Sequence, residues 1–304
     1  HEVGADWEPY LNWLHIISDL PLYRALIVTD PAYGFLNWLA SKTGGGIYFV
    51  NTVCAALLLA GVLQVANLTR YPFLGLVAAV PYLIIVVGMG YTRQSAAIGL
   101  VMIALAQLHK ERVWSYVFFT IFAALFHKSA VIMIPLAILA SKNKRLIKIA
   151  IIGPLAIAAF YELLLPSLAG MWENYVEESM QSRGALVRII MNTIPAMGIL
   201  VFRNQIFTIT DNDRLWVVIA ALALFTAILV NHASTAVDRI HLYFTPLQVI
   251  FFGNAPKIFK GTIPRTACAA LEILYYLSVQ VVWLSHADHS EHWIPYALMS
   301  SRPL

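Results

Sequence analysis

The chain has 304 residues, of which 60% are hydrophobic and only 12% are charged, and its mean hydropathy is +0.73. Soluble domains are about 45–50% apolar and about 25% charged, so this composition excludes an ordinary soluble domain and indicates an integral membrane protein. We attribute the net charge of +4 to basic loops on the cytoplasmic side of a membrane, and we expect no nucleic-acid partner.

Continuous apolar runs predict helices rather than strands. Runs such as AALLLAGVLQVA and WVVIAALALFTAILV are longer than the barrel strands of about 10 residues in which apolar and polar residues alternate. A helix also satisfies its own backbone hydrogen bonds within lipid. We therefore predict an all-α polytopic membrane protein with a single membrane domain over residues 1–304.

The first 44 residues are too polar to span a membrane. Segments 6–19 and 30–42 each begin with an acid and mix Trp and Tyr with apolar residues, which suits the membrane–water boundary. We predict that residues 1–44 form two short helices lying flat on the outer surface. Because His1 opens a polar stretch rather than an apolar run, we also expect a spanning helix before this sequence.

Ten apolar segments follow, and a preceding helix would bring the total to about eleven. Several are shorter than the roughly 20 residues of an untilted span. The FHKS sequence between two of them is placed in a turn at the surface, because charge in the middle of a membrane is costly. The predicted spans are 46–67, 73–89, 94–108, 113–126, 129–140, 147–166, 186–202, 215–231, 240–255 and 264–284.

The distribution of charge among the loops predicts the orientation. One set of alternate loops, which includes 141–148, carries most of the Lys and Arg, whereas the other loops and the tails carry most of the Asp and Glu. Basic residues are enriched in cytoplasmic loops. We therefore place residue 1, the C-terminus and an outer loop at 170–187 on the outer side of the membrane.

Eight basic residues contradict this rule, and the five that lie at helix ends become candidate site residues. Each lies where an outer loop meets a helix end, and a cation there is costly unless something anionic is close. They are Arg93, Lys128, Arg183, Arg188 and Arg239.

The YTRQSAA sequence places Arg93 and Gln94 at the outward end of a helix. Their charge and N–H donors add to the partial positive charge of a helix N-terminus, and this combination suits a phosphate group. The alternative is an arginine that reaches toward lipid head groups.

The FHKS sequence offers His127 as a proton donor or acceptor near neutral pH and Lys128 as a point charge for phosphate. The alternative is a polar turn in which Ser129 is the N-cap of the next helix.

Two further segments carry candidate polar groups. In DRIHLY, Arg239 and Tyr243 are four residues apart and share a helix face, although Asp238 and Arg239 could equally form a local ion pair. In DWEPY, Asp6 and Tyr10 have the same spacing, and Asp6 could accept a proton from a sugar hydroxyl or simply cap a helix.

In this order, the segments VGADWEPY, DPAYGFLNWL, YTRQSAAIGL, FAALFHKSAVIMIPLAIL and WIPYAL resemble the EpsG family over nearly the whole chain. That family is similar to the Wzy-type polymerases of bacterial exopolysaccharide, capsule and O-antigen synthesis. Asp30 stands where glutamate is more usual, and it keeps the carboxylate.

The resemblance implies a glycosyltransferase-C-like fold in the bacterial inner membrane and a substrate oligosaccharide on an undecaprenyl diphosphate carrier. It also implies a flippase and a chain-length regulator as partners. Because the diphosphate already activates the anomeric carbon, we expect neither a metal nor a cofactor.

The roles expected from the residues and the resemblance fall into two groups. The catalytic group stabilises the departing diphosphate or takes the proton of the attacking hydroxyl, with either Asp6 or His127 as the base. It comprises Asp6, Arg93, His127 and Arg239. The substrate-binding group comprises Tyr10, Asp30, Tyr33, Gln94, Lys128, Arg183, Arg188 and Tyr243, with Tyr10 and Tyr33 stacking on sugars.

Two other functions remain open at this stage. A membrane O-acyltransferase would also be multispan and carry a histidine near a bilayer face, but it would need a route for acyl-CoA from the cytoplasm. A flippase or transporter for lipid-linked oligosaccharide would favour broken helices with charge at the midplane.

Overall fold

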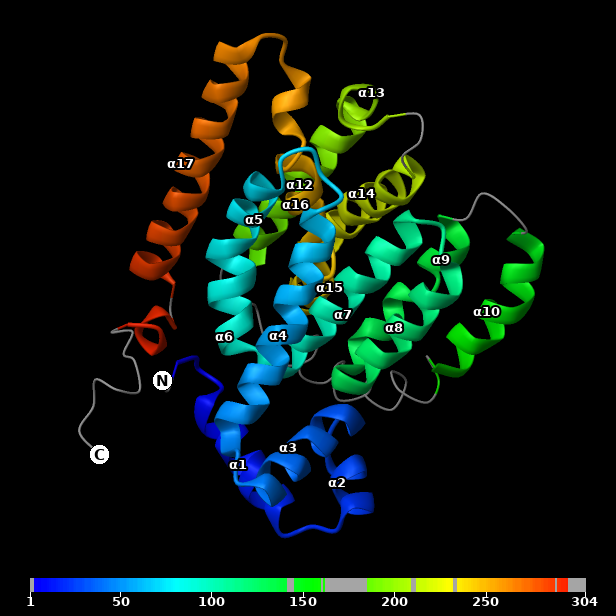
Figure 1. Ribbon diagram of the computed structural model, residues 1–304, viewed down its shortest axis with the longest axis vertical. Helices are drawn as coiled ribbons and strands as arrows, with labels where there is room; N and C mark the ends of the chain where they lie inside the picture. Colours follow the sequence, from blue (N-terminus) through cyan, green and yellow to red (C-terminus); the bar gives the residue numbers. More distant parts are fainter. Residues whose placement is uncertain are drawn as a thin grey trace.

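A computed structural model describes residues 3–140, 145–159, 161, 185–208, 212–231, 234–287 and 289–294. Within these ranges every regular element is a helix (Figure 1), which confirms the all-α prediction. The α-helices are α1 (Trp7–Ser18), α2 (Leu22–Val28), α3 (Pro31–Thr43), α4 (Gly46–Ala66), α5 (Pro72–Ala79), α6 (Gly88–Gly90), α7 (Thr92–His109), α8 (Val113–Phe126), α9 (Leu136–Leu139), α10 (Arg145–Ala159), α12 (Ala185–Val201), α13 (Arg203–Ile206), α14 (Asp213–Ala227), α15 (Ser234–Leu242), α16 (Pro246–Phe252) and α17 (Thr262–His286).

Short 3-10 and π-helical pieces complete the bundle. The π-helical η1 (Val80–Val87) joins α5 to α6, so that residues 72–90 form one continuous helical rod. The 3-10 pieces are η2 (Lys128–Met133), η5 (Ile228–Asn231), η6 (Ala255–Ile258) and η7 (Ser290–His292).

Four helical stretches in the described ranges are long and apolar enough to cross a membrane: Gly46–Ala66, Pro72–Gly90, Asp213–Asn231 and Thr262–His286. They match four of the ten predicted spans. Other predicted spans are shorter apolar helices, including α8 and α12. The span predicted over 147–166 corresponds to α10 in part, and most of its last residues lie outside the described ranges.

Two predicted spans are interrupted rather than built from one regular α-helix. Segment 129–140 divides into η2 and α9 at Pro135, and segment 240–255 divides into the end of α15, α16 and η6. Proline lacks the N–H that a helix interior needs, which explains why α9 follows Pro135 and α16 starts at Pro246.

Three helices, rather than the two predicted, form within the first 44 residues. Helices α1 and α3 coincide with the predicted segments, and the additional α2 packs against α3. The three lie together at the end of the bundle where α4 begins (Figure 1), which we call the α1–α3 end. Their position flat on a membrane surface remains a prediction.

Helix α7 is the central element, because most of its side chains are buried and it packs against both α4 and α8. Its contact with α4 brings two backbones together at glycines. A Cβ added at Gly61 would lie 2.2 Å from the carbonyl oxygen of Gly99, and one at Gly99 would lie 2.3 Å from that of Leu57. Small residues at such crossings are typical of membrane helices, and this contact fixes the position of Arg93 at the start of α7.

The two ends of the described chain meet beside the start of α7. The N–H of Gly4 donates to the carbonyl of His292 over 3.0 Å, and the Trp293 indole donates to the carbonyl of Ile85. Gly4 has φ +103°, and a Cβ there would lie 2.9 Å from the Cα of Gly90. This close approach holds the residues after Gly4, which include Asp6, next to the N-terminus of α7.

The packing of α4 on α7 predicts that Gly99→Ala destabilises the protein. The added methyl group forces the two backbones apart, and overpacking of this kind costs about 1–3 kcal/mol. Thermal unfolding of the purified protein in detergent measures the loss. The matched control is Gly153→Ala on α10, where an added Cβ meets no atom within 4 Å. Equal melting temperatures for the two variants would contradict the packing argument.

Candidate functional site

Charged residues from five separate segments gather at the α1–α3 end. Asp6 precedes α1, Asp30 precedes α3 and Arg93 lies in the first turn of α7. His127 and Lys128 connect α8 to η2, and Arg239 lies on α15. The electrostatic interactions described below link all of them, so the structure brings these sequence-distant residues together.

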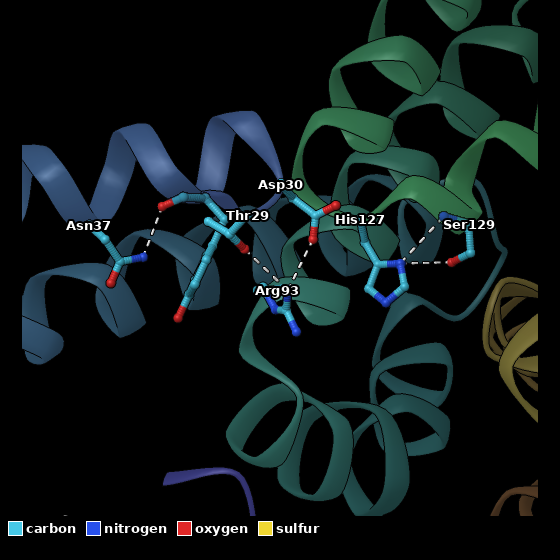
Figure 2. Close-up of polar contacts among 7 residues, drawn as sticks. Thr29, Asp30, Asn37, Arg93, His127 and Ser129 are labelled. Carbon is cyan, nitrogen blue, oxygen red and sulfur yellow. Dashed lines mark hydrogen bonds and ion pairs between the residues drawn. The ribbon is translucent and has the colours of Figure 1, made fainter. Parts of the chain in front are cut away.

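Arg93 is anchored by the loop between α2 and α3 (Figure 2). Its Nη1 donates to Asp30 Oδ2 over 3.2 Å and to Thr29 Oγ1 over 3.3 Å, and its guanidinium carbon lies 5.7 Å from the centroid of the Tyr33 ring. The Arg93 side chain remains 32% exposed, whereas that of Asp30 is 8% exposed. The loop therefore orients the guanidinium while leaving part of it accessible to a ligand.

The two carboxylates of the site are held among cations. Burial raises the pKa of Asp30, and the positive charges of Arg93 and Lys128 oppose that shift. Burial likewise raises the pKa of Asp6, and Arg239 and Arg93 oppose it. Because the charge of Arg93 acts on both acids, Asp6 and Asp30 both lie within electrostatic range of the same guanidinium.

His127 is the N-cap of η2 and joins a hydrogen-bonded chain to Tyr243, the residue that follows α15. Its Nδ1 accepts from the backbone N–H of Ser129 and lies 2.9 Å from Ser129 Oγ. Ser129 Oγ lies in turn 2.9 Å from the Tyr243 hydroxyl. His127 therefore caps this helix, so the alternative in which Ser129 is the N-cap is wrong. Ser129 instead supports the imidazole.

Lys128 and Arg239 are both exposed, and their charges reach the same groups as Arg93. Lys128 acts on Asp30 and His127, and Arg239 acts on Asp6 and His127. Three cations thus border one accessible region at the α1–α3 end. Such a region can hold a polyanion with more than one negatively charged oxygen.

Arg188 forms a separate ion pair beside this region. Its Nε and Nη2 donate to the two carboxylate oxygens of Asp238 over 2.6 and 2.7 Å, so Asp238 pairs with a residue of a different helix. The residues are 50 positions apart, and nothing in the sequence indicated the pairing. The pair lines a small cavity with room for about one water molecule, next to Tyr82 and His241.

Several predicted substrate contacts are buried in this structure. The Tyr33 ring is fully buried below Arg93, and only 7% of Tyr10 is exposed, so neither ring presents a face to a sugar as predicted. Gln94 is 5% exposed and Tyr243 is fully buried. These side chains lie behind the charged region. Gln94, for example, is next to Arg93 on α7, and adjacent residues of a helix point in directions about 100° apart. Arg183 and most of the outer loop 170–187 lie outside the described ranges.

Thr29 and Ser129 were not predicted as site residues. Each supports a predicted one, Thr29 through its bond to Arg93 and Ser129 through its bond to His127. Hydroxyls beside a charged residue are common in loops and turns, so their sequence context gave no specific signal. Among the residues that the structure describes, no group of three or more His, Cys, Asp or Glu is arranged to hold a metal ion.

The chain matches the model of the EpsG family over residues 1–298. No curated protein matches it, and no solved structure matches it. The match covers the charged region at the α1–α3 end as well as the helices that carry it. This chain therefore belongs to the EpsG family, a family of exopolysaccharide and Wzy-like polymerases.

Proposed function

We propose that this protein is a polysaccharide polymerase of the bacterial inner membrane. It transfers a glycan from undecaprenyl diphosphate to a lipid-linked repeat unit on the outer side of the membrane. The observation that carries the proposal is the convergence of Arg93, Lys128 and Arg239 around two carboxylates. Membership of the EpsG family supplies the class of product, and the cations supply a reason for a diphosphate substrate.

The reaction needs charge stabilisation and one proton acceptor. A hydroxyl oxygen of the acceptor sugar attacks the anomeric carbon, and the bond from that carbon to the diphosphate oxygen breaks with its electron pair on the diphosphate. Arg93, Lys128 and Arg239 stabilise the growing negative charge. One preorganised donor of this kind typically contributes about 10²–10³ in rate.

Asp6 is the better of the two carboxylates for the role of base. Asp30 is buried and bonded to Arg93, so its charge serves to orient the guanidinium. Asp6 is partly exposed, and burial raises its pKa above the ordinary value of 3.8. A raised pKa makes the ionised carboxylate a stronger proton acceptor.

A transporter of lipid-linked oligosaccharide is the alternative that a specific observation favours. Buried polar side chains form a chain through the core, in which Tyr276 donates to Gln248 and Gln248 donates to Asn192. Polar groups in the middle of a bundle are typical of transport paths. A transporter would move lipid-linked units without lengthening the glycan, which distinguishes the two functions.

Replacing Arg93 or Arg239 by alanine is predicted to shorten the polymer and to lower its yield by about 10²-fold, because each removes one donor from the departing diphosphate. Gel analysis of polysaccharide from cells that carry each variant measures both. The matched control is Arg70→Ala, because Arg70 is exposed at the opposite end of α4.

Normal polymer length and yield in both Arg93→Ala and Arg239→Ala would overturn the proposal. The amount of each variant in the membrane is measured in parallel, so that loss of protein is not mistaken for loss of activity.

The assignment of Asp6 as base predicts a pH dependence. Activity requires the carboxylate, so it is present above the Asp6 pKa and falls as the pH drops through it. Because that pKa is raised from 3.8, the acid limb of kcat/KM lies above pH 3.8. We expect Asp6→Asn to lose most of the reaction rate and the acid limb of the kcat/KM profile. Glu8→Gln, on the exposed face of α1, is expected to keep both the rate and the acid limb. If Asp6→Asn keeps the full reaction rate and the acid limb of the kcat/KM profile, Asp6 is not the base.

A further inference from the structure

The hydrogen bonds of His127 determine which of its ring nitrogens carries a proton. The backbone N–H of Ser129 points at Nδ1, and Ser129 Oγ lies 2.9 Å from the same atom. A backbone N–H can only donate. Nδ1 must therefore act as an acceptor, and the hydrogen of the neutral ring lies on Nε2.

The Tyr243 hydroxyl completes this arrangement. Since Nδ1 accepts, the Ser129 hydroxyl can donate to it and in turn accept from Tyr243 across 2.9 Å. Tyr243 is fully buried, so its hydroxyl is held in place by packing. The three groups form a directional chain from Tyr243 through Ser129 to His127.

The surroundings of His127 also oppose a second proton on the ring. Burial lowers the pKa of His127, and the charges of Arg239, Arg93 and Lys128 lower it further. A positive imidazolium would stand among three other cations. The ring is therefore neutral at physiological pH, and it has an N–H to offer and no free lone pair.

We propose that His127 is a neutral hydrogen-bond donor, through Nε2–H, to an oxygen of the departing diphosphate, and that Ser129 and Tyr243 are positioning residues that fix its tautomer. This inference rests on the proposed function for the identity of the ligand. It changes the expectation that His127 is one of two candidate bases. The diphosphate leaves with its negative charge and takes no proton from His127, and the proton of the sugar hydroxyl goes to Asp6.

Figure 2 shows how the His127 ring is oriented relative to Ser129. The Nδ1 edge of the ring faces Ser129, and the other nitrogen projects away from it. A neutral donor adds to the cations without adding their repulsion, since it brings no net charge of its own.

The first test compares three replacements of His127 in a chain-extension assay. A glutamine amide can place an N–H near the position of Nε2, whereas asparagine is shorter and alanine has no donor. We expect His127→Gln to retain activity within about 10-fold of wild type, and His127→Ala and His127→Asn to lose about 10²-fold or more, the range for one lost donor. An equal loss in all three variants would overturn the donor role, because glutamine cannot replace a base.

The second test determines the tautomer of His127 directly and does not depend on a chain-extension assay. Protein labelled with ¹⁵N in its histidine rings is reconstituted in lipid nanodiscs, and the His127 signals are identified by their absence in His127→Gln. We expect an unprotonated Nδ1 and a protonated Nε2 throughout about pH 6–8, the range in which an ordinary histidine titrates. A protonated Nδ1, or a ring that titrates in this range, would overturn the proposal.

The same spectra test the positioning residues. Ser129→Ala and Tyr243→Phe are expected to increase the population of the other tautomer, whereas Ser278→Ala on α17, whose hydroxyl bonds only its own helix, leaves the spectrum unchanged. Unaltered His127 signals in both site variants would contradict the positioning role. If the tautomer is as expected but the purified protein does not extend lipid-linked glycans, the proposed function fails and the tautomer assignment stands.

Discussion

The bond between Arg93 and Asp30 is the interaction on which the candidate site depends. Helix α7 is buried along most of its length, and a guanidinium at its first turn would be costly without a nearby anion. Asp30 supplies that anion across 3.2 Å and is itself almost fully buried. The ion pair therefore ties the α2–α3 loop to the central helix and orients Arg93, whose side chain stays 32% exposed.

The rest of the architecture holds this pair in place. Contact between glycines sets α7 directly against α4, and the close approach of Gly4 to Gly90 brings the chain of Asp6 to the same point. Side chains that a sequence reading assigns to the substrate, such as Tyr33 and Tyr243, instead lie behind the surface. They hold Arg93 and, through Ser129, His127. The accessible groups are few and charged, and the groups behind them determine their orientation.

Much of this arrangement could be predicted from the sequence, because composition determines the helical class and charge in an apolar chain is rare enough to be informative. The proximity of Arg93, Lys128 and Arg239 could be predicted because all three are basic residues on the side of the membrane where basic residues are normally depleted. The pairing of Arg188 with Asp238 did not, since it depends on how α12 and α15 pack. The break at Pro246 was also missed, because the apolar pattern continues across it. The N-cap role of His127 depends on side-chain geometry that no local pattern encodes.

The central claim is that Arg93 stabilises a departing lipid diphosphate. The most direct measurement uses purified protein in lipid, a synthetic oligosaccharide on a polyprenyl diphosphate, and product length as the readout. We predict that the wild-type protein extends the glycan equally well with and without a metal chelator, and that the folded fraction of Arg93→Gln extends it at least about 10²-fold more slowly. Extension by Arg93→Gln at the wild-type rate would contradict the account.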